Sequence, residues 1–251
     1  MENEIIYGRN SVFEALKTNP SRINKIIISK NVNNDKKINE IIDLAKENKI
    51  LFQFSPKEKF NSFQDVNHQG VLAYVAPIEY HSLDDFLNQN KDGFKRLIAL
   101  DGVQDPHNFG AIIRTCACAG FDGIIISARK STLVTGIVEK TSAGAINHIP
   151  IILVNSLSSS LEKLKKHDYW IIATDIKAKD NYFEVDYTDM NLVIVLGAEG
   201  DGVSKTVLNG ADMKVKIPML CDFNSLNVSN AAAVLIYEVV KQVVQKTKNI
   251  V

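Results

Sequence analysis

Apolar residues recur along the chain in two patterns, and their alternation predicts an α/β protein. Short apolar runs typical of buried strands are separated by stretches in which apolar residues return every third or fourth position, as on one helix face. From Arg96 onward the alternation predicts a parallel sheet covered on both faces. The strands expected there are 97–100, 123–127, 151–154, 170–174, 192–196 and 214–217. The expected helices are 109–119, 132–142, 158–166 and 205–208, with a long one beginning near Asn224 or Ser225.

The first part of the chain predicts a smaller α/β unit of its own. Its expected elements are a helix opening at Ser11, strands at 23–29, 50–54 and 71–75, and a helix at 36–48. Residues 77–94 are polar and contain a Pro and a Gly, which is typical of a linker, although a short helix could start at Ser82. We therefore expect domains at 1–76 and 95–251, joined by a linker at 77–94.

Composition narrows the functional classes. The chain has 251 residues, 45% hydrophobic and 23% charged, as in a globular protein, and no apolar run is long enough to predict a membrane span. The N-terminal residues show no signal peptide, and the three cysteines Cys116, Cys118 and Cys221 predict a reducing compartment without disulfides. Cys116 and Cys118 are too close for a usual zinc pair, so we expect them to pack in the core. We expect a cytoplasmic protein that binds neither a metal nor a membrane.

The balance of charge argues against a simple nucleic-acid coat protein. The 29 basic and 29 acidic residues cancel, whereas such proteins are strongly basic. A local basic face remains compatible with this balance. Side chains that could line an RNA surface on the first domain are Arg9, Arg22, Lys25, Lys30, Lys36 and Lys37.

Ligands of open parallel sheets bind beyond the carboxyl ends of the strands, which directs attention to three loops. The first loop, 101–110, has two glycines and leads past Asn108, a plausible helix cap, to Arg114. The second, 196–204, has three glycines around Glu199. The third follows residue 217 and carries Ser225 and Asn227 into the long helix. Each alone is also compatible with an ordinary turn or cap. Neither the dinucleotide-binding fingerprint nor the Walker pattern occurs, which disfavours a nucleotide-dependent oxidoreductase.

Together, the three loops resemble the motifs of a known family. The stretches DPHNFGAIIR, VLGAEGDGVS and IPMLCDFNSLNVSNAAAVLIYE are similar to the three motifs of the SpoU (TrmH-like) RNA ribose methyltransferases, which belong to the trefoil-knotted SPOUT superfamily. Residues 5–76 resemble the L30e-like substrate-binding domain of the same family. Within the family, the similarity is greatest to members that 2′-O-methylate a guanosine in the peptidyl-transferase P-loop of 23S rRNA.

The resemblance implies a donor, a site and partners. The methyl donor would be S-adenosylmethionine, held inside a deep knot, and the protein would be a homodimer acting on 23S rRNA. Matched by position, the catalytic residues would be Asn108, Arg114, Glu199, Ser225 and Asn227. The residues expected to bind the donor would be Thr174, Leu196, Gly197, Ile217, Met219 and Leu226.

Physical chemistry restricts the roles these residues can take. A guanidinium resists deprotonation, so we expect Arg114 to hold a phosphate of the target nucleotide and to stabilise developing negative charge on the oxygen. Glu199 would orient Asn108 and Arg114 or bind the ribose, and Ser225 and Asn227 would fix the helix opening. His107 is more typical of a structural hydrogen bond than of a general base. Two alternatives stay open: a tRNA ribose methyltransferase and a non-catalytic RNA-binding protein of the same fold.

Overall fold

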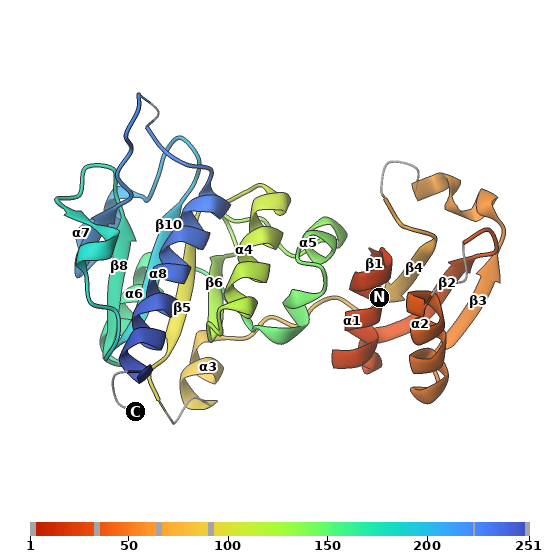
Figure 1. Cartoon of the computed structure of the whole chain (residues 1–251). Coiled ribbons are helices and arrows are strands. Elements are labelled where there is room, and N and C mark those ends of the chain that lie inside the picture. Colours follow the sequence, from red (N-terminus) through yellow and green to blue (C-terminus); the bar gives the residue numbers. More distant parts are fainter. Residues whose placement is uncertain (1–3, 33–35, 64–66, 90–92, 223, 249–251) are drawn as a thin grey trace. The chain divides into compact units, whose positions relative to one another are not determined.

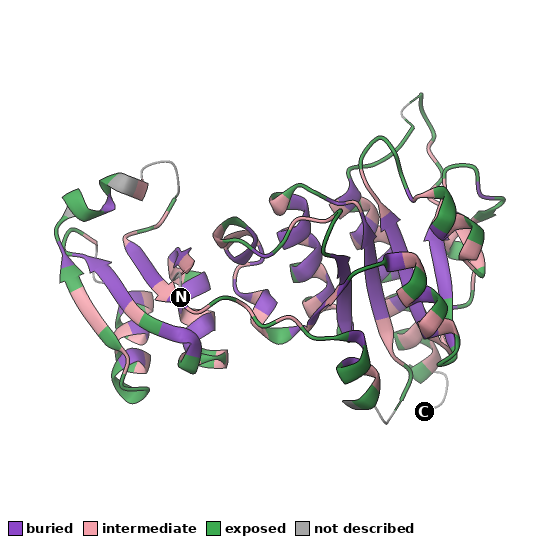
Figure 2. Ribbon diagram, turned by 180° about the vertical axis from the view of Figure 1, so that it is seen from behind, coloured by how far each residue is buried: buried purple, intermediate pink, exposed green. Residues whose placement is uncertain are grey.

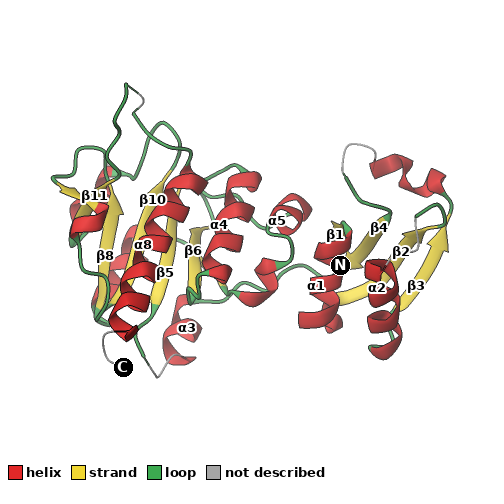
Figure 3. Ribbon diagram, viewed as in Figure 1, coloured by secondary structure: helices red, strands yellow, loops and turns green. Residues whose placement is uncertain are grey.

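The chain divides into two compact units, each with its own sheet (Figures 1 and 3). The computed structural model describes residues 4–32, 36–63, 67–89, 93–222 and 224–248. Unit 1 spans Met1–Glu79 and Val134–His148, and unit 2 spans Tyr80–Leu133 and Ile149–Val251. The domain division drawn from the sequence remains a prediction. The packing of 134–148 with unit 1 is an observation that no local sequence pattern had indicated.

Unit 1 contains a four-stranded sheet in the order β1-β4-β2-β3. The strands are β1 (Glu4–Tyr7), β2 (Ile23–Ser29), β3 (Leu51–Ser55) and β4 (Val71–Val75). The α-helices are α1 (Arg9–Thr18), α2 (Lys36–Glu47) and α5 (Gly136–Thr141), with 3₁₀ turns at Pro20–Arg22, Lys57–Phe63 and Ala145–His148. β2 and β3 are parallel, and the other pairs are antiparallel. The prediction that α1 opens at Ser11 was wrong: α1 begins at Arg9 after Gly8, and Ser11 is buried inside it.

A buried ion pair holds the segment 134–148 within unit 1. Arg22 donates from Nη2 to Glu139 Oε1 at 2.6 Å and from Nη1 to Glu139 Oε2 at 3.1 Å. Two glycines permit close contact along the same segment: a Cβ on Gly136 would lie 2.6 Å from Ile5 O, and one on Gly144 would lie 2.3 Å from Glu14 Cβ. Arg22, expected on an RNA-binding surface, is therefore a buried structural residue.

Unit 2 is built on a seven-stranded sheet in the order β7-β6-β5-β10-β8-β11-β9. The strands are β5 (Arg96–Asp101), β6 (Gly123–Ser127), β7 (Ile151–Val154), β8 (Tyr169–Thr174), β9 (Asp180–Asn181), β10 (Asn191–Gly197) and β11 (Met213–Lys216). All neighbouring strands of this sheet pair in parallel. The predicted parallel α/β sheet is confirmed, and only the two-residue β9 was not expected.

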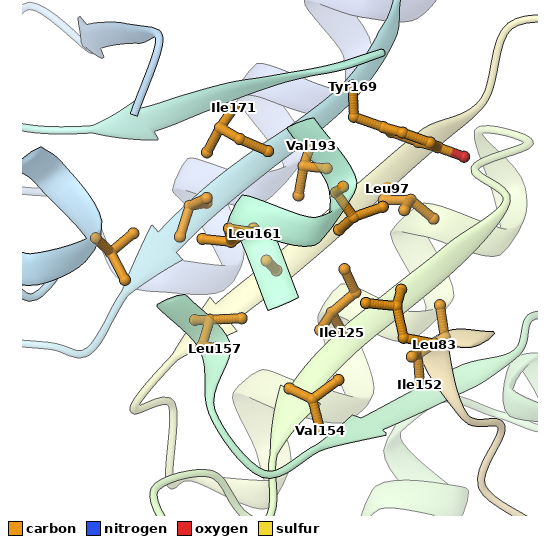
Figure 4. Close-up of a cluster of buried hydrophobic side chains, with 14 of the residues drawn as sticks. Leu83, Leu97, Ile125, Ile152, Val154, Leu157, Leu161, Tyr169, Ile171 and Val193 are labelled. Atoms are coloured by element: carbon orange, nitrogen blue, oxygen red, sulfur yellow. The ribbon is translucent and has the colours of Figure 1, made fainter. Parts of the chain in front are cut away.

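Helices cover both faces of the unit 2 sheet. These are α3 (Leu83–Gln89), α4 (Pro106–Cys118), α6 (Leu157–Lys165), α7 (Lys205–Gly210) and α8 (Val228–Lys248). α4 and α8 contact each other in front of the sheet as Figure 1 shows it. On the other face, side chains of α3, α6 and α7 pack on alternate strand residues such as Leu97, Ile125 and Val193 (Figure 4). The central strands are buried along almost their whole length (Figure 2).

Helix starts differ most from the sequence-based expectation. The long helix α8 begins at Val228, a few residues later than the expected start near Asn224 or Ser225. The helix expected over 132–142 is shortened to α5 because Thr135 caps it, accepting from Val138 N. Ser82 does cap α3, accepting from Asp85 N at 3.0 Å. In the described part of the chain, no helix is both long and apolar enough to traverse a bilayer. The expected knot and the L30e-like character of unit 1 stay predictions.

Candidate active site

The three loops singled out in the sequence leave the sheet at one edge. β5 and β10 pair in parallel with Asp101 opposite Gly197, and β8 connects β10 to β11 in the same parallel sheet. The carboxyl ends of these strands therefore point the same way, and the loops after residues 101, 197 and 216 meet there.

The first loop ends in a well-capped helix start. Asp105 is the N-cap of α4, and its Oδ1 accepts from His107 N at 2.9 Å, while Pro106 occupies the first helical position. The expectation that Asn108 caps this helix was wrong. Asn108 lies in the first turn of α4 and is 8% exposed, and its side chain does not cap the helix. The capping by Asp105 leaves the Asn108 amide available for contacts with the other loops.

The second loop folds tightly back on itself. Gly202 N donates to Ala198 O at 3.0 Å, and a Cβ on Gly197 would lie 1.9 Å from the carbonyl carbon of Gly202. Gly197 is therefore needed for the loop to close on its own backbone. Gly200 and Gly202 adopt φ values of 87° and 67°, in the left-handed region that favours glycine.

A buried carboxylate ties the first loop to the second. Asp101, 7% exposed at the end of β5, accepts from Ser204 N at 2.8 Å across 103 residues of sequence. Gly102 and Ala198 also approach each other, since a Cβ on Gly102 would lie 3.5 Å from Ala198 Cβ. Sequence reasoning missed Asp101 as a positioning residue. Its place at the carboxyl end of a central strand was the one signal that could have identified it.

The third loop ends where Asn227 caps α8. Asn227 Oδ1 accepts from Ser229 N at 3.0 Å, from Ser229 Oγ at 2.6 Å and from Asn230 N at 3.4 Å. The oxygen of this amide is thus committed to the helix start, which turns its nitrogen toward the other loops.

Asn108, Glu199 and Asn227 form one hydrogen-bonded cluster, with each residue from a different loop. Asn227 Nδ2 donates to Glu199 Oε1 at 2.7 Å and to Asn108 Oδ1 at 2.9 Å. Asn108 Nδ2 donates to the same Glu199 oxygen at 3.1 Å. Glu199 is 91 positions and Asn227 is 119 positions from Asn108 along the chain, and both are in direct contact with it. We call these three residues the amide–carboxylate cluster.

Two expected catalytic residues lie outside this cluster. Arg114 is exposed on α4, six residues beyond Asn108, which is about 9 Å along a helix axis. Ser225 is exposed two residues before Asn227. Neither side chain has a hydrogen bond or ion pair to another described residue, so both are available to a ligand.

The expected donor-binding residues gather along the same edge. Thr174 ends β8, and its Oγ1 donates to Val195 O at 3.1 Å; Leu196 and Gly197 end β10. Ile217, Met219 and Leu226 follow β11 in a segment without regular structure. Residues 217–222 and 224–226 form no main-chain hydrogen bonds within the described part of the chain. Their N–H and C=O groups are open to a ligand.

The described residues offer the site no cluster of metal ligands, and the thiol of Cys116 is inert. No group of three or more His, Cys, Asp or Glu residues is arranged to hold a metal among the described residues. Cys116 is buried, and burial raises the pKa of its thiol far above the usual range, so it is an inert core residue. The expectation of core packing is confirmed for Cys116 and was wrong for Cys118, which is exposed.

Comparison with known proteins agrees with this geometry. The SpoU rRNA Methylase family matches residues 95–237, and the family described as RNA 2′-O ribose methyltransferase substrate binding matches residues 5–81. A putative TrmH family tRNA/rRNA methyltransferase of Staphylococcus saprophyticus is 43% identical over 244 residues, covering 96% of this chain and 97% of that protein. A Staphylococcus aureus protein of the same description is 42% identical with the same coverage.

Solved structures share the fold at lower identity. The SpoU methyltransferase AviRb from Streptomyces viridochromogenes has a TM-score of 0.82 at 19% identity, covering 97% of this chain and 91% of that chain. AviRb has also been solved in complex with the cofactor AdoMet, S-adenosylmethionine. An AdoMet-bound rRNA methyltransferase from Sinorhizobium meliloti has a TM-score of 0.79 at 21% identity, covering 95% and 87% of the two chains. Matched by a family model over 95–237 and by relatives over 40% identical along nearly its whole length, this chain belongs to the SpoU (TrmH) family of RNA methyltransferases.

Proposed function

We propose that this protein transfers a methyl group from S-adenosylmethionine to the 2′-hydroxyl of a guanosine ribose in the peptidyl-transferase P-loop of 23S rRNA. The observation that carries the proposal is the amide–carboxylate cluster, in which three distant motif loops converge in hydrogen-bonded contact. Capping of α8 accounts for the oxygen of Asn227 alone, whereas the contacts among the three side chains join different loops at one point, which a non-catalytic RNA-binding protein would not require.

The residues along the sheet edge fit S-adenosylmethionine. Its adenine and ribose need apolar contact and hydrogen bonds, and the segment after β11 supplies both. Ile217, Met219 and Leu226 are only partly buried or exposed, and the neighbouring main-chain groups are unpaired within the described residues. When bound, the donor would supply a sulfonium-activated methyl, so the protein's contribution is positioning, which can lower a barrier by about 7–11 kcal/mol.

The roles of the polar residues follow from their chemistry. Gly197 would let the second loop close beside the donor, and Thr174 and Leu196 would form the floor of its site. Arg114, an exposed cation without a partner in the described chain, would hold a phosphate beside the target ribose. Ser225, equally unpaired, would bind the nucleotide from the third loop.

Unit 1 would bind the RNA outside the reacting nucleotide. The match to a substrate-binding family supports this assignment. Lys30 and Lys36 are exposed, and Lys25 is partly exposed, so phosphate contacts are open to them. Lys37 lies 3.1 Å from the centre of the Phe13 ring and pairs with Glu40, so it has less freedom to contribute.

We further propose a cytoplasmic homodimer that pairs through α8. Tyr237 and Val244 on this helix are 51% and 46% exposed, and they lie seven positions apart, so both offer apolar surface on one side of the helix to a second copy. Gel filtration with light scattering tests this directly. A purely monomeric protein at micromolar concentration would refute the dimer.

Ribose methylation mapped across 23S rRNA and tRNA tests the substrate. We expect cells lacking this protein to lose one 2′-O-methylguanosine in the P-loop of 23S rRNA, and the purified protein to restore it on unmodified RNA. A tRNA substrate is the second candidate, because the similar staphylococcal proteins are described as tRNA/rRNA methyltransferases. Loss of a tRNA mark with every rRNA mark retained would establish that candidate instead.

A further inference from the structure

The hydrogen bonds of the amide–carboxylate cluster leave one atom without a partner. Asn227 uses its oxygen for the α8 start and its nitrogen for Asn108 and Glu199. Asn108 uses both its oxygen and its nitrogen within the cluster. Glu199 accepts both of its bonds on Oε1. Oε2 of Glu199 has no hydrogen-bond partner among the described residues. Glu199 is exposed, so this oxygen is accessible to a ligand at the site.

This arrangement fixes a carboxylate oxygen in place and leaves it open to an incoming group. Two amide donors at 2.7 and 3.1 Å on Oε1 hold the carboxylate plane, so the direction of Oε2 is set as well. Neutral amides cannot take up a proton, and a guanidinium resists giving one up. Within the cluster, Oε2 is therefore the atom able to act as a base.

We propose that Glu199 Oε2 accepts the proton of the ribose 2′-hydroxyl during methyl transfer, which makes Glu199 the general base of the reaction. This inference rests on the proposed function. As the 2′-oxygen bonds to the methyl carbon, the bond from that carbon to sulfur breaks and the hydroxyl proton passes to Oε2. The products are the 2′-O-methyl ribose, the neutral thioether S-adenosylhomocysteine and a protonated Glu199, which returns its proton to water.

A carboxylate is strong enough for this task. An alcohol oxygen that is forming a third bond gains positive charge, and its proton becomes far more acidic than that of a free hydroxyl. A weak base that receives the proton late in the step is sufficient, and general bases of this kind contribute about 10²–10⁴-fold to a rate. Arg114 is then free to bind phosphate and need not lose a proton.

Other titratable groups border the site and must be separated from Glu199 in any pH experiment. On the elements around it they are Asp101, Asp105, His107, Asp201, Lys205, Cys221 and Asp222. Asp101 and Asp105 each commit one oxygen to a backbone N–H, which gives them structural roles.

Replacement of Glu199 by glutamine tests the proposal without dismantling the cluster. In Glu199→Gln the amide oxygen can still accept both bonds on Oε1, while an NH₂ that cannot take a proton replaces Oε2. Asp201→Asn is the matched control, because it removes an exposed carboxylate two residues away in the same loop. Turnover is measured with S-adenosylmethionine and an unmodified 23S rRNA transcript, and donor affinity by calorimetry.

We expect Glu199→Gln to lower kcat by about 10²–10⁴-fold while donor affinity and RNA affinity stay within a few-fold of wild type. Wild-type kcat should fall at low pH and that of this variant should not, whereas Asp201→Asn should keep both the wild-type rate and the wild-type profile. In Glu199→Gly, added formate should restore part of the rate, which a purely structural role would not allow. Near-wild-type turnover of Glu199→Gln, or an unchanged low-pH fall in its kcat, would overturn the proposal while leaving methyl transfer established. A wild-type protein that binds RNA and donor but methylates nothing would instead refute the proposed function.

Discussion

Replacement of Glu139 by glutamine is the sharpest test of how unit 1 holds the segment 134–148. The change removes one negative charge and keeps the shape of the side chain. Arg22 and Glu139 are 5% and 3% exposed, so the guanidinium would stay buried without its main counter-charge. Burial raises the pKa of the Glu139 carboxyl, and hydrogen bonding to Arg22 opposes that shift. The ionised form of Glu139 therefore depends on Arg22 in the interior.

The size of the effect follows from the contacts. Removal of one partner of a buried ion pair typically destabilises a protein by about 3–5 kcal/mol. Glu4 lies 3.5 Å from Arg22 Nη2 and remains as a second, half-exposed partner. We therefore expect a loss near the lower end, about 3 kcal/mol, which raises the opened fraction of unit 1 roughly a hundredfold.

Hydrogen exchange measures this loss unit by unit. Amides of β2, β4 and the segment 134–148 should lose protection in Glu139→Gln, while those of β5 and β10 should not. Glu40→Gln is the matched control, since it breaks the half-exposed pair with Lys37 and should change stability by no more than about 0.5 kcal/mol. The double variant Arg22→Met/Glu139→Leu should regain most of the protection, because apolar residues can replace a buried pair. An equal, small effect of Glu139→Gln and Glu40→Gln would refute the reasoning.

Three further predictions follow from single residues. Gly197→Ala should abolish donor binding and turnover, because its Cβ would lie 1.9 Å from the backbone of Gly202, which cannot move aside. Gly210→Ala in α7 is the control and should be tolerated. Calorimetry with S-adenosylmethionine checks both variants. Arg114→Lys should lose most of the turnover if Arg114 holds a phosphate through two N–H groups, and near-normal turnover would exclude that geometry. Desolvation, and secondarily the charge of Lys140, lower the pKa of His68 in the folded protein. The neutral imidazole therefore contributes stability above about pH 6.5, and this contribution is lost as the pH falls through the folded pKa. Between pH 7.5 and 5.5, the free energy of unfolding should change less with pH in His68→Asn than in the wild-type protein. An unchanged slope of that free energy against pH would contradict this.

The sequence predicted the sheet of unit 2 well because buried parallel strands are continuous apolar runs. Its strands fall within one residue of the expected ranges, apart from β9, which has two polar residues and no apolar run to signal it. β1 was missed because its four residues include Glu4 and a terminal Tyr7. Helix starts were less predictable, since Asp105 and Asn108 are both chemically able to cap a helix and only the chain path decides between them.

Long-range contacts set the limit of sequence reasoning about the site. The motif resemblance singled out Asn108, Glu199 and Asn227, and the structure brings these three together. The burial of Arg22 could not be foreseen, because its partner Glu139 lies 117 residues further along the chain. The hydrogen bond between Ser204 N and Asp101 also has no local sequence pattern, because the two residues are 103 positions apart.

Methyl transfer by the purified protein is the most direct measurement of whether the converged loops form the reacting site. Wild-type protein and Asn227→Ala are incubated with labelled S-adenosylmethionine and unmodified 23S rRNA, and the RNA is digested to nucleosides for mass spectrometry. The proposed function predicts one 2′-O-methylguanosine with the wild-type protein, and the cluster predicts at least a hundredfold less ribose methylation with Asn227→Ala, roughly the loss expected when a preorganised polar group is removed from a reacting site. A methyl group on a base, or equal ribose methylation by both proteins, would contradict it.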